Sequence, residues 1–213
     1  MVSVCFYFQV HQPCRLKRYQ VFDIGSGKSY FDDDKNSTII HKVAQKCYLP
    51  ANKVLLELLQ RYPQFKISFS FSGIFLEQCQ EFYPEIIQSF QELVKTGQVE
   101  ILSETYYHSL SFLYSEPEFL AQVELHKRKI HELFGVTPLV LRNTELIYTN
   151  DLASHLAKLG YKGVIAEGTE RILKEVSPNY VQAAVQTDKV KVLTKNYSLS
   201  DDLAFRFSDK NWS

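Results

Sequence analysis

The residues of this sequence that could carry out chemistry are carboxylates, imidazoles, amides and hydroxyls that follow apolar, strand-like stretches. In chain order they are His11, Gln12, Ser72, Glu104, Tyr106, Tyr107, His108, Glu145, Glu167, Asn196, Tyr197, Asp201 and Asp202. Cleavage of a glycosidic bond uses such a set. One carboxylate acts as nucleophile or base, a carboxylic acid donates a proton, and polar or aromatic groups hold the sugar.

Each of these residues also has a structural interpretation. Glu145 lies in the run LRNTELIY (residues 141–148), whose apolar side chains would partly desolvate a carboxylate that lacks a partner. Arg142 is close enough in sequence to be that partner, so the residues alone fit a catalytic and a structural Glu145 equally well. Glu167, directly before Gly168, is expected to cap the next helix or pair with a neighbouring arginine rather than to act in catalysis. His126 and His131 are expected on the solvated face of a helix.

The elements that must position these residues alternate between strands and helices. Strands are predicted at residues 2–10, 65–72, 99–104, 139–142, 161–166 and 190–194. The first reads as a fully buried strand, and residues 15–35 as a long loop. Two helices follow, the second beginning at Pro50, and a capping box at residues 115–118 opens a later helix that ends at Gly135. Strands separated by helices imply a parallel sheet with crossover connections.

The sequence favours a β/α barrel over an open nucleotide-binding sheet. Neither G-x-G-x-x-G nor a Walker A motif follows a strand, and the glycines at 25 and 27 form an isolated turn signal. In a β/α barrel, functional residues gather at the C-terminal ends of the strands, where the residues named above are placed. Six strands are too few to close a typical barrel. Because residues 209–213 (DKNWS) also end the chain without a terminal helix, we expect a truncated sequence.

Composition excludes several classes of partner. The 24 Lys and Arg residues balance the 24 Asp and Glu residues, which argues against nucleic acid or an anionic membrane as the main partner. Four cysteines without close paired spacing are expected to be buried free thiols in a reducing compartment. With no leader pattern and no apolar run of membrane-spanning length, we expect a soluble, cytoplasmic protein.

Three stretches resemble the signature regions of glycoside hydrolase family 57. They are VCFYFQVHQP (residues 4–13), GQVEI with ETYYH after it (residues 97–108), and RNTELIY (residues 142–148), in the family's order. KCYLPAN (residues 46–52) and LSDDLAFRFSD (residues 199–209) are similar to its α-amylase-like subgroup.

The resemblance implies a seven-stranded β/α barrel, a retaining mechanism and α-glucan substrates, with no metal or other cofactor. The fold class expected is therefore α/β, an incomplete (β/α)7 barrel with six of the parallel strands present. By position, Glu145 becomes the nucleophile that forms a covalent glycosyl-enzyme intermediate. His11 and His108 become sugar-binding residues, with Gln12, Glu104 and Tyr107 beside them.

A retaining mechanism also needs a second carboxyl group about 5 Å from the nucleophile. In the family this group is an aspartate in a fourth signature, on the strand after the six predicted here. No such signature precedes Ser213. We therefore expect residues 1–213 to be a single catalytic barrel domain that is truncated at its C-terminal end and inactive alone.

Three alternatives remain open at this point. An α-glucan transferase of the same family shares the covalent intermediate and differs only in the group that attacks it. A non-catalytic glucan-binding barrel would keep the fold without the acid. A metal-dependent polysaccharide deacetylase needs an aspartate and two histidines on one metal. The sequence has Asp33 and Asp34 in a predicted loop, but no histidine pair at suitable spacing at a strand end.

Overall fold

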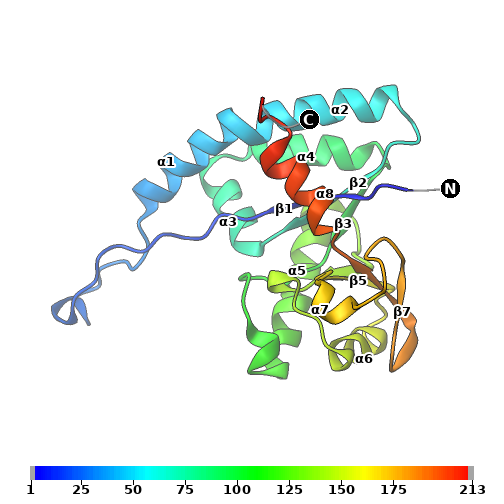
Figure 1. Ribbon diagram of the computed structural model, residues 1–213. Helices are drawn as coiled ribbons and strands as arrows, with labels where there is room; N and C mark the ends of the chain where they lie inside the picture. The colour runs from blue at the N-terminus through cyan, green and yellow to red at the C-terminus, as the bar shows by residue number, and fades with distance from the viewer. Residues whose placement is uncertain (1–2, 211–213) are drawn as a thin grey trace. The chain divides into compact units, whose positions relative to one another are not determined.

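The computed structural model describes residues 3–210, apart from the side chains at positions 170 and 172. The chain forms two compact units, Met1–Thr137 and Pro138–Ser213, and each has a sheet of its own (Figure 1). The main elements of the first unit are β1 (Phe6–Val10), α1 (Asp33–Val43), α2 (Leu49–Arg61), β2 (Ile67–Phe71), α3 (Gly73–Phe82), α4 (Glu85–Lys95), β3 (Val99–Leu102) and α5 (Glu116–Phe134). Those of the second are β4 (Val140–Arg142), α6 (Asn150–Lys158), β5 (Gly163–Ala166), α7 (Glu170–Leu173), β6 (Gln182–Ala184), β7 (Thr187–Thr194) and α8 (Tyr197–Asp201).

The sheet of the first unit has an apolar face and a polar face. Its three strands are parallel in the order β1-β2-β3, with Phe69 opposite both Phe8 and Ile101. In β2 the alternation ISFSF sends Ile67, Phe69 and Phe71 into the core, where side chains of all five helices meet them. Because successive side chains of a strand point to opposite faces, the buried Ser70 lies on the other face, where its hydroxyl is 3.2 Å from that of Tyr7.

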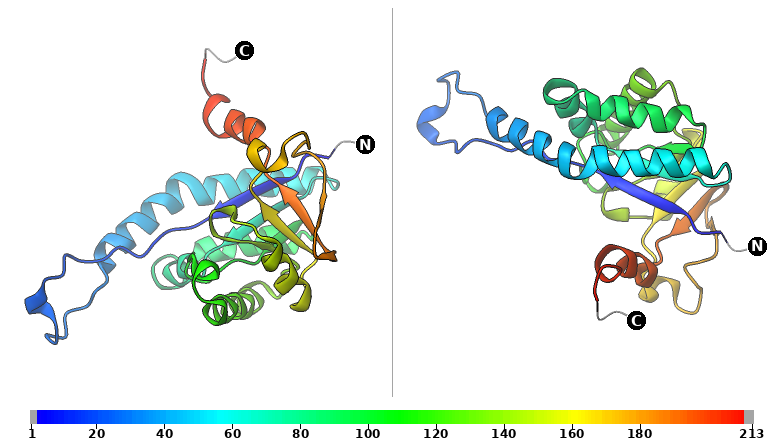
Figure 2. Two further views of the ribbon diagram at one scale, coloured as in Figure 1. Left: turned by 60° about the horizontal axis from the view of Figure 1, so that its bottom comes forward. Right: turned by 90° about the horizontal axis from the view of Figure 1, so that it is seen from above.

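Residues 33–61 form one continuous helical segment, in which α2 begins at Leu49, one residue before the predicted start at Pro50. A π-helical turn, Ala44–Tyr48, joins α1 to α2, and the backbone is helical throughout the junction (Figure 2). Pro50 has no N–H, and in a regular α-helix its ring would collide with the carbonyl of Lys46. Within the wider turn the Leu49 N–H donates to the Ala44 carbonyl, five residues back. This local widening accommodates the proline without a break.

Most of the predicted loop at residues 15–35 is a two-armed excursion, and α1 begins at Asp33. An antiparallel bridge pairs Leu16 with Phe31, and the Lys17 N–H donates to the Tyr30 carbonyl at 2.8 Å. The two arms run side by side away from β1 and α1 in every view (Figures 1 and 2). Stacked rings of Tyr19 and Tyr30, 4.4 Å apart, join them. The two arms of the excursion are therefore held together by contacts of their own.

The sheet of the second unit has the order β4-β5-β7-β6. The strands β4, β5 and β7 are parallel, with Leu141 opposite Val164 and Val164 opposite Val192. β6 is antiparallel to β7 and forms a hairpin with it. Leu152 and Leu156 of α6 are fully buried in this unit, as are Val164 and Val190 of the strands.

All six predicted strands are observed, although Val2 lies outside the described residues. Residues 3–210 contain seven strands in two sheets, because β6 escaped prediction; the incomplete six-stranded barrel is therefore not confirmed. The prediction that the first strand is fully buried is wrong: β1 is an edge strand, and Phe8 is 39% exposed.

The prediction of buried thiols holds only for Cys79. Cys5 and Cys47 are exposed and Cys14 is intermediate, and all four thiols are free. Across the described part of the chain, no helix has the length and apolar character that crossing a membrane requires.

Candidate active site

In the first unit, residues from the ends of all three strands come together. His11 follows β1, Ser72 follows β2, and Glu104 follows β3 by two residues. The His11 Nδ1 atom and the Ser72 hydroxyl form a hydrogen bond of 2.7 Å. The Ser72 N–H donates to the Val10 carbonyl, which continues the β1–β2 pairing to the point where His11 begins. Parallel strands thus present His11, Ser72 and Glu104 at one edge of the sheet, as the sequence predicted for His11 and Glu104.

His108 lies directly against His11. The two rings are stacked, with centroids 4.2 Å apart and planes at 22°. His108 has the left-handed backbone conformation, with φ at 54°, in a tight turn where its N–H donates to the Thr105 carbonyl. The Gln9 amide nitrogen lies 3.5 Å from His108 Nε2, and Glu104 Oε2 lies 3.8 Å from Nδ1. This arrangement favours the tautomer that carries its proton on Nδ1, facing the carboxylate.

Glu104 is completely buried, and behind it lies a histidine that sequence reasoning placed wrongly. His126 is fully buried rather than solvated, and its Nε2 donates to the Phe71 carbonyl at 2.7 Å. Burial lowers the pKa of His126, while the charge of Glu104 and the hydrogen bond to Phe71 act in the opposite direction. The sequence pattern could have indicated this burial. His126 shares one face of α5 with residues 119, 123 and 130, and these three are apolar.

Gln12 and Tyr107 have different surroundings. The Gln12 side chain accepts from the Arg15 guanidinium at 2.8 Å, and its amide lies 3.5 Å from the Tyr48 hydroxyl. It therefore contacts the base of the two-armed excursion. Tyr107 is 50% exposed on the turn that carries His108, and its ring makes an edge contact with Tyr106.

Tyr106 in turn occupies the space beside Gly73. An added Cβ at Gly73 would lie 2.4 Å from the Tyr106 ring, and the Gly73 N–H donates to the Tyr106 carbonyl. The Tyr106 hydroxyl donates to Glu77 at 2.5 Å. Burial, followed by the hydrogen bond to Glu77, raises the pKa of Tyr106. Gly73 therefore allows this tyrosine to anchor the turn that carries Tyr107 and His108.

Glu145 belongs to the second unit and lies in a strained turn after β4. Glu145 and Leu146 both have left-handed backbone conformations, with φ at 55° and 56°. Such conformations cost about 1–3 kcal/mol each for residues other than glycine and cluster at functional sites. Glu145 is exposed and Arg142 is buried, so the expectation that apolar neighbours desolvate Glu145 is wrong. The turn directs the carboxylate outward, although the residues on both sides of it are apolar.

Two more polar side chains stand at the strand ends of the second unit. Glu167 follows β5, and its carboxylate accepts a hydrogen bond of 2.9 Å from the Tyr197 hydroxyl at the start of α8. The neighbouring arginine that the sequence suggested is not the partner in this contact, which is a tyrosine 30 residues along the chain.

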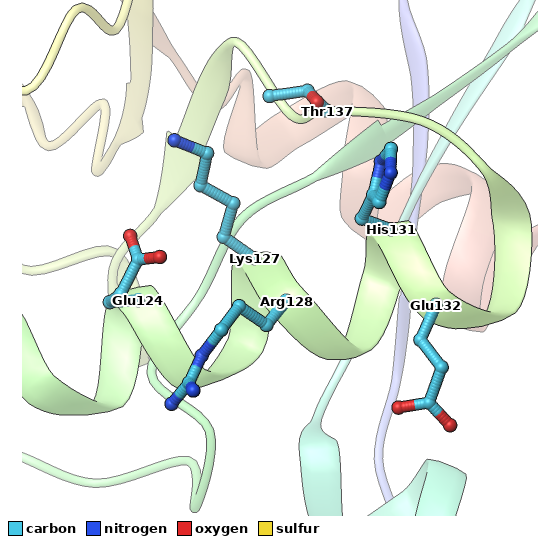
Figure 3. A pocket seen from close by; sticks show the side chains of 6 residues that line it. All are labelled: Glu124, Lys127, Arg128, His131, Glu132 and Thr137. Atoms are coloured by element: carbon cyan, nitrogen blue, oxygen red, sulfur yellow. The ribbon is translucent and has the colours of Figure 1, made fainter.

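Other candidate sites in the described residues are weak. A surface depression is lined by Glu124, Lys127, Arg128, His131, Glu132 and Thr137. Lys127 and His131 project to one side of α5, and Arg128 and Glu132 to the other (Figure 3). These side chains therefore do not converge on one point. Across the described residues, no group of three His, Cys, Asp or Glu side chains could hold a metal ion.

The arrangement can hydrogen-bond a polyhydroxylated ligand in the first unit and offers an exposed carboxylate in the second. Fold and site define an α/β protein whose imidazoles and carboxylates gather at the C-terminal ends of parallel strands. Residues 5–213 match the sequence profile of Glycosyl hydrolase family 57. The chain therefore belongs to glycosyl hydrolase family 57, as the resemblance of its motifs implied.

A Methanocaldococcus jannaschii protein provisionally named an alpha-amylase is 43% identical over 212 residues, which are 98% of this chain and 44% of that protein. The chain thus spans less than half the length of this relative. The crystal structure of the 4-alpha-glucanotransferase from Thermococcus litoralis aligns with a TM-score of 0.69 at 21% identity, over 95% of this chain and 29% of that one. A family 57 branching enzyme from Thermococcus kodakaraensis, in complex with glucose, aligns with a TM-score of 0.67 at 12% identity, over 98% of this chain and 50% of that one. At these identities the two structures show a shared fold.

Proposed function

We propose that this chain supplies the nucleophile and the sugar-binding histidines of a retaining glycoside hydrolase that acts on α-glucans. The observation that carries the proposal is the cluster of His11, Glu104 and His108, which follow two different strands and in which His108 lies against both of the others. Family membership and the alpha-amylase name of the 43% identical relative support the same substrate class. Gln12 and Tyr107 complete the proposed sugar-binding set.

In the proposed mechanism Glu145 acts as the nucleophile. One of its carboxylate oxygens attacks the anomeric carbon, the bond to the leaving glycosyl oxygen breaks, and a carboxylic acid protonates that oxygen. Water then attacks the anomeric carbon, and its proton goes to the group that acted as the acid, which is now a carboxylate. The bond from the anomeric carbon to Glu145 breaks, and Glu145 is released. The strained turn at Glu145 supports the assignment, because left-handed residues other than glycine are costly and are retained where function needs them.

The proposed architecture is an incomplete (β/α)7 barrel in which residues 1–213 belong to one catalytic domain. The six parallel strands found in the two sheets are consistent with this proposal. The acid/base group is assigned to an aspartate outside these residues, on the strand that would follow β7. The greater length of the Methanocaldococcus jannaschii relative supports this assignment, and we infer that residues 1–213 alone do not turn over substrate.

A transferase is the second candidate. The name of the Thermococcus litoralis protein, 4-alpha-glucanotransferase, favours it. In this reaction the 4-hydroxyl of a second glucan, instead of water, attacks the glycosyl-enzyme and gives its proton to the base.

We further infer a cytoplasmic location, because the four cysteines are free thiols and two of them are exposed.

The experiment is an assay of the full-length gene product on soluble starch, compared with its Glu145→Gln variant. We expect the wild type to release reducing sugar and the variant to lose turnover by several orders of magnitude while it unfolds at the same temperature, because the substitution is nearly isosteric. An activated glycosyl fluoride should also label the peptide that contains Glu145 in the wild type. Maltooligosaccharide products longer than the substrate would identify the transferase. Residual activity within tenfold of wild type would remove Glu145 as nucleophile, and glucan binding without any turnover would favour the non-catalytic barrel.

A further inference from the structure

Three strand ends of the second unit are joined to one another by main-chain hydrogen bonds. The Glu167 N–H, just after β5, donates to the Leu146 carbonyl at 3.2 Å. On the other side, the Lys195 N–H, just after β7, donates to the Ala166 carbonyl at 3.0 Å. The segment after β5 is therefore held between the turn that carries Glu145 and the segment that leads into α8.

A side-chain contact ties the same segments together. The Tyr197 hydroxyl donates to Glu167 Oε1 at 2.9 Å, and the Lys195 ammonium lies 4.2 Å from the centre of the Tyr197 ring. A hydrogen bond to a carboxylate is stronger than a neutral one, and a cation over the ring face adds to the anchoring of the tyrosine. Tyr197 thus has a fixed position from which it holds Glu167.

The surroundings of Tyr197 keep its hydroxyl a donor. Burial, the hydrogen bond to Glu167 and the charges of Glu167, Asp201 and Glu145 all raise the pKa of Tyr197. The phenol therefore keeps its proton at neutral pH and can serve a carboxylate only as a donor. The Glu167 carboxylate accepts this hydrogen bond.

The turn at Glu145 needs this kind of support. Two consecutive left-handed residues, Glu145 and Leu146, persist only when the structure around them over-determines their conformation. Within the turn, the Leu146 N–H donates to the Asn143 carbonyl and the Asn143 side-chain amide to the Ile147 carbonyl. From outside the turn, the Glu167 N–H binds the Leu146 carbonyl, next to Glu145 in the chain.

We propose that Glu167 and Tyr197 are a positioning pair for Glu145. The Tyr197 hydroxyl holds the Glu167 side chain, and the Glu167 main chain holds the Leu146 carbonyl, so that the carboxylate of Glu145 keeps one direction. The proposal rests on the function proposed above for Glu145. It adds two positioning residues, one after β5 and one at the start of α8.

The first test is amide hydrogen exchange, which does not depend on activity. Tyr197→Phe and Glu167→Leu should raise exchange at the Leu146 and Glu167 amides about tenfold, the size expected for one lost charge-assisted hydrogen bond. The Val192 amide, inside β7, should exchange as in the wild type. Glu167→Gln keeps an acceptor oxygen without the charge and should raise exchange less than Glu167→Leu does. Tyr180→Phe, which removes an exposed hydroxyl in the same unit, should behave as the wild type. Unchanged protection at Leu146, or an equal acceleration at Val192, would overturn the proposal.

The second test is kinetic and uses the full-length protein. Tyr197→Phe should lower kcat and the rate of glycosyl-enzyme formation about tenfold while KM stays within about twofold, because a displaced nucleophile affects the transition state more than binding. Tyr180→Phe should retain wild-type kcat, and Glu167→Gln should lower kcat less than Tyr197→Phe does. If Tyr197→Phe has wild-type kcat while the wild type itself is active, the positioning pair is wrong and the proposed function stands. If the wild type forms no glycosyl-enzyme, the proposed function fails, and the exchange measurement still decides whether the pair holds the turn.

Discussion

The imidazole rings of His11 and His108 are stacked at 4.2 Å, although the two residues follow different strands of the first sheet. Each ring is held by a different neighbour: Ser72 bonds His11 Nδ1, and Glu104 lies near His108 Nδ1. The stack therefore depends on all three strand ends being in register. This cluster is the feature on which glucan binding is proposed to depend.

We predict that His11→Ala and His108→Ala each weaken glucan binding about tenfold, the loss of one or two polar contacts. Calorimetry with maltoheptaose would measure this in the full-length protein that carries Glu145→Gln, so that no turnover occurs. In the double variant, the loss of binding free energy should be smaller than the sum of the losses in the two single variants, since each ring supports the other. His131→Ala, an exposed histidine on α5, should bind as the parent does. Equal affinity in all variants would exclude the cluster as a sugar site.

The buried His126 should make folding stability depend on pH. Its pKa lies below the ordinary value of 6.5, chiefly because burial disfavours the charged imidazole. As the pH falls below about 6.5, the unfolded chain binds a proton that the folded chain excludes. The free energy of unfolding therefore falls, by at most about 1.4 kcal/mol per pH unit, until the pH reaches the depressed pKa. Above pH 6.5 this contribution is constant.

Urea unfolding between pH 5.5 and pH 7.5 would measure this slope. For His126→Gln, the free energy of unfolding should change less with pH over this range than in the wild type, because glutamine can donate to the Phe71 carbonyl without titrating. His131→Gln should keep the wild-type slope, since His131 is exposed on the same helix. A slope that is identical in wild type and His126→Gln would show that His126 is not the group responsible.

Gly168 should resist substitution for a reason that Gly163 does not share. A Cβ at Gly168 would lie 2.1 Å from the Lys195 carbonyl oxygen, whereas at Gly163 the nearest atom is a Val140 methyl at 3.4 Å. Backbone cannot step aside as a side chain can, so Gly168→Ala should cost about 3 kcal/mol, near the upper end for overpacking. Gly163→Ala should change stability by less than about 1 kcal/mol. Urea unfolding followed at amides of β5 and β7 would compare the two, and equal costs would contradict the close approach.

Local patterns in the sequence were enough for six of the seven strands in the described residues, both ends of α5 and the order of the motifs. The six predicted strands are present because their apolar runs are β-rich. Ser115 accepts from the Glu118 N–H, and Gly135 takes the left-handed conformation at the end of α5, because caps depend on residues a few positions apart. β6 was missed because it is three residues long, QAA, and is held by pairing with β7. Pro50 lies in the first turn of α2, as predicted, but a π-helical turn joins this helix to α1 without a break.

By itself, the sequence determined which residues stand at strand ends and, through its motifs, the family to which the chain belongs. Only the tertiary structure decided the contacts among these residues: the stack of His11 on His108, the burial of His126 and the bond from Tyr197 to Glu167. The left-handed turn at Glu145 also belongs to this second group. The reason is that propensity and periodicity act between neighbours in the chain, whereas these features depend on main-chain and side-chain hydrogen bonds between segments that folding alone brings together.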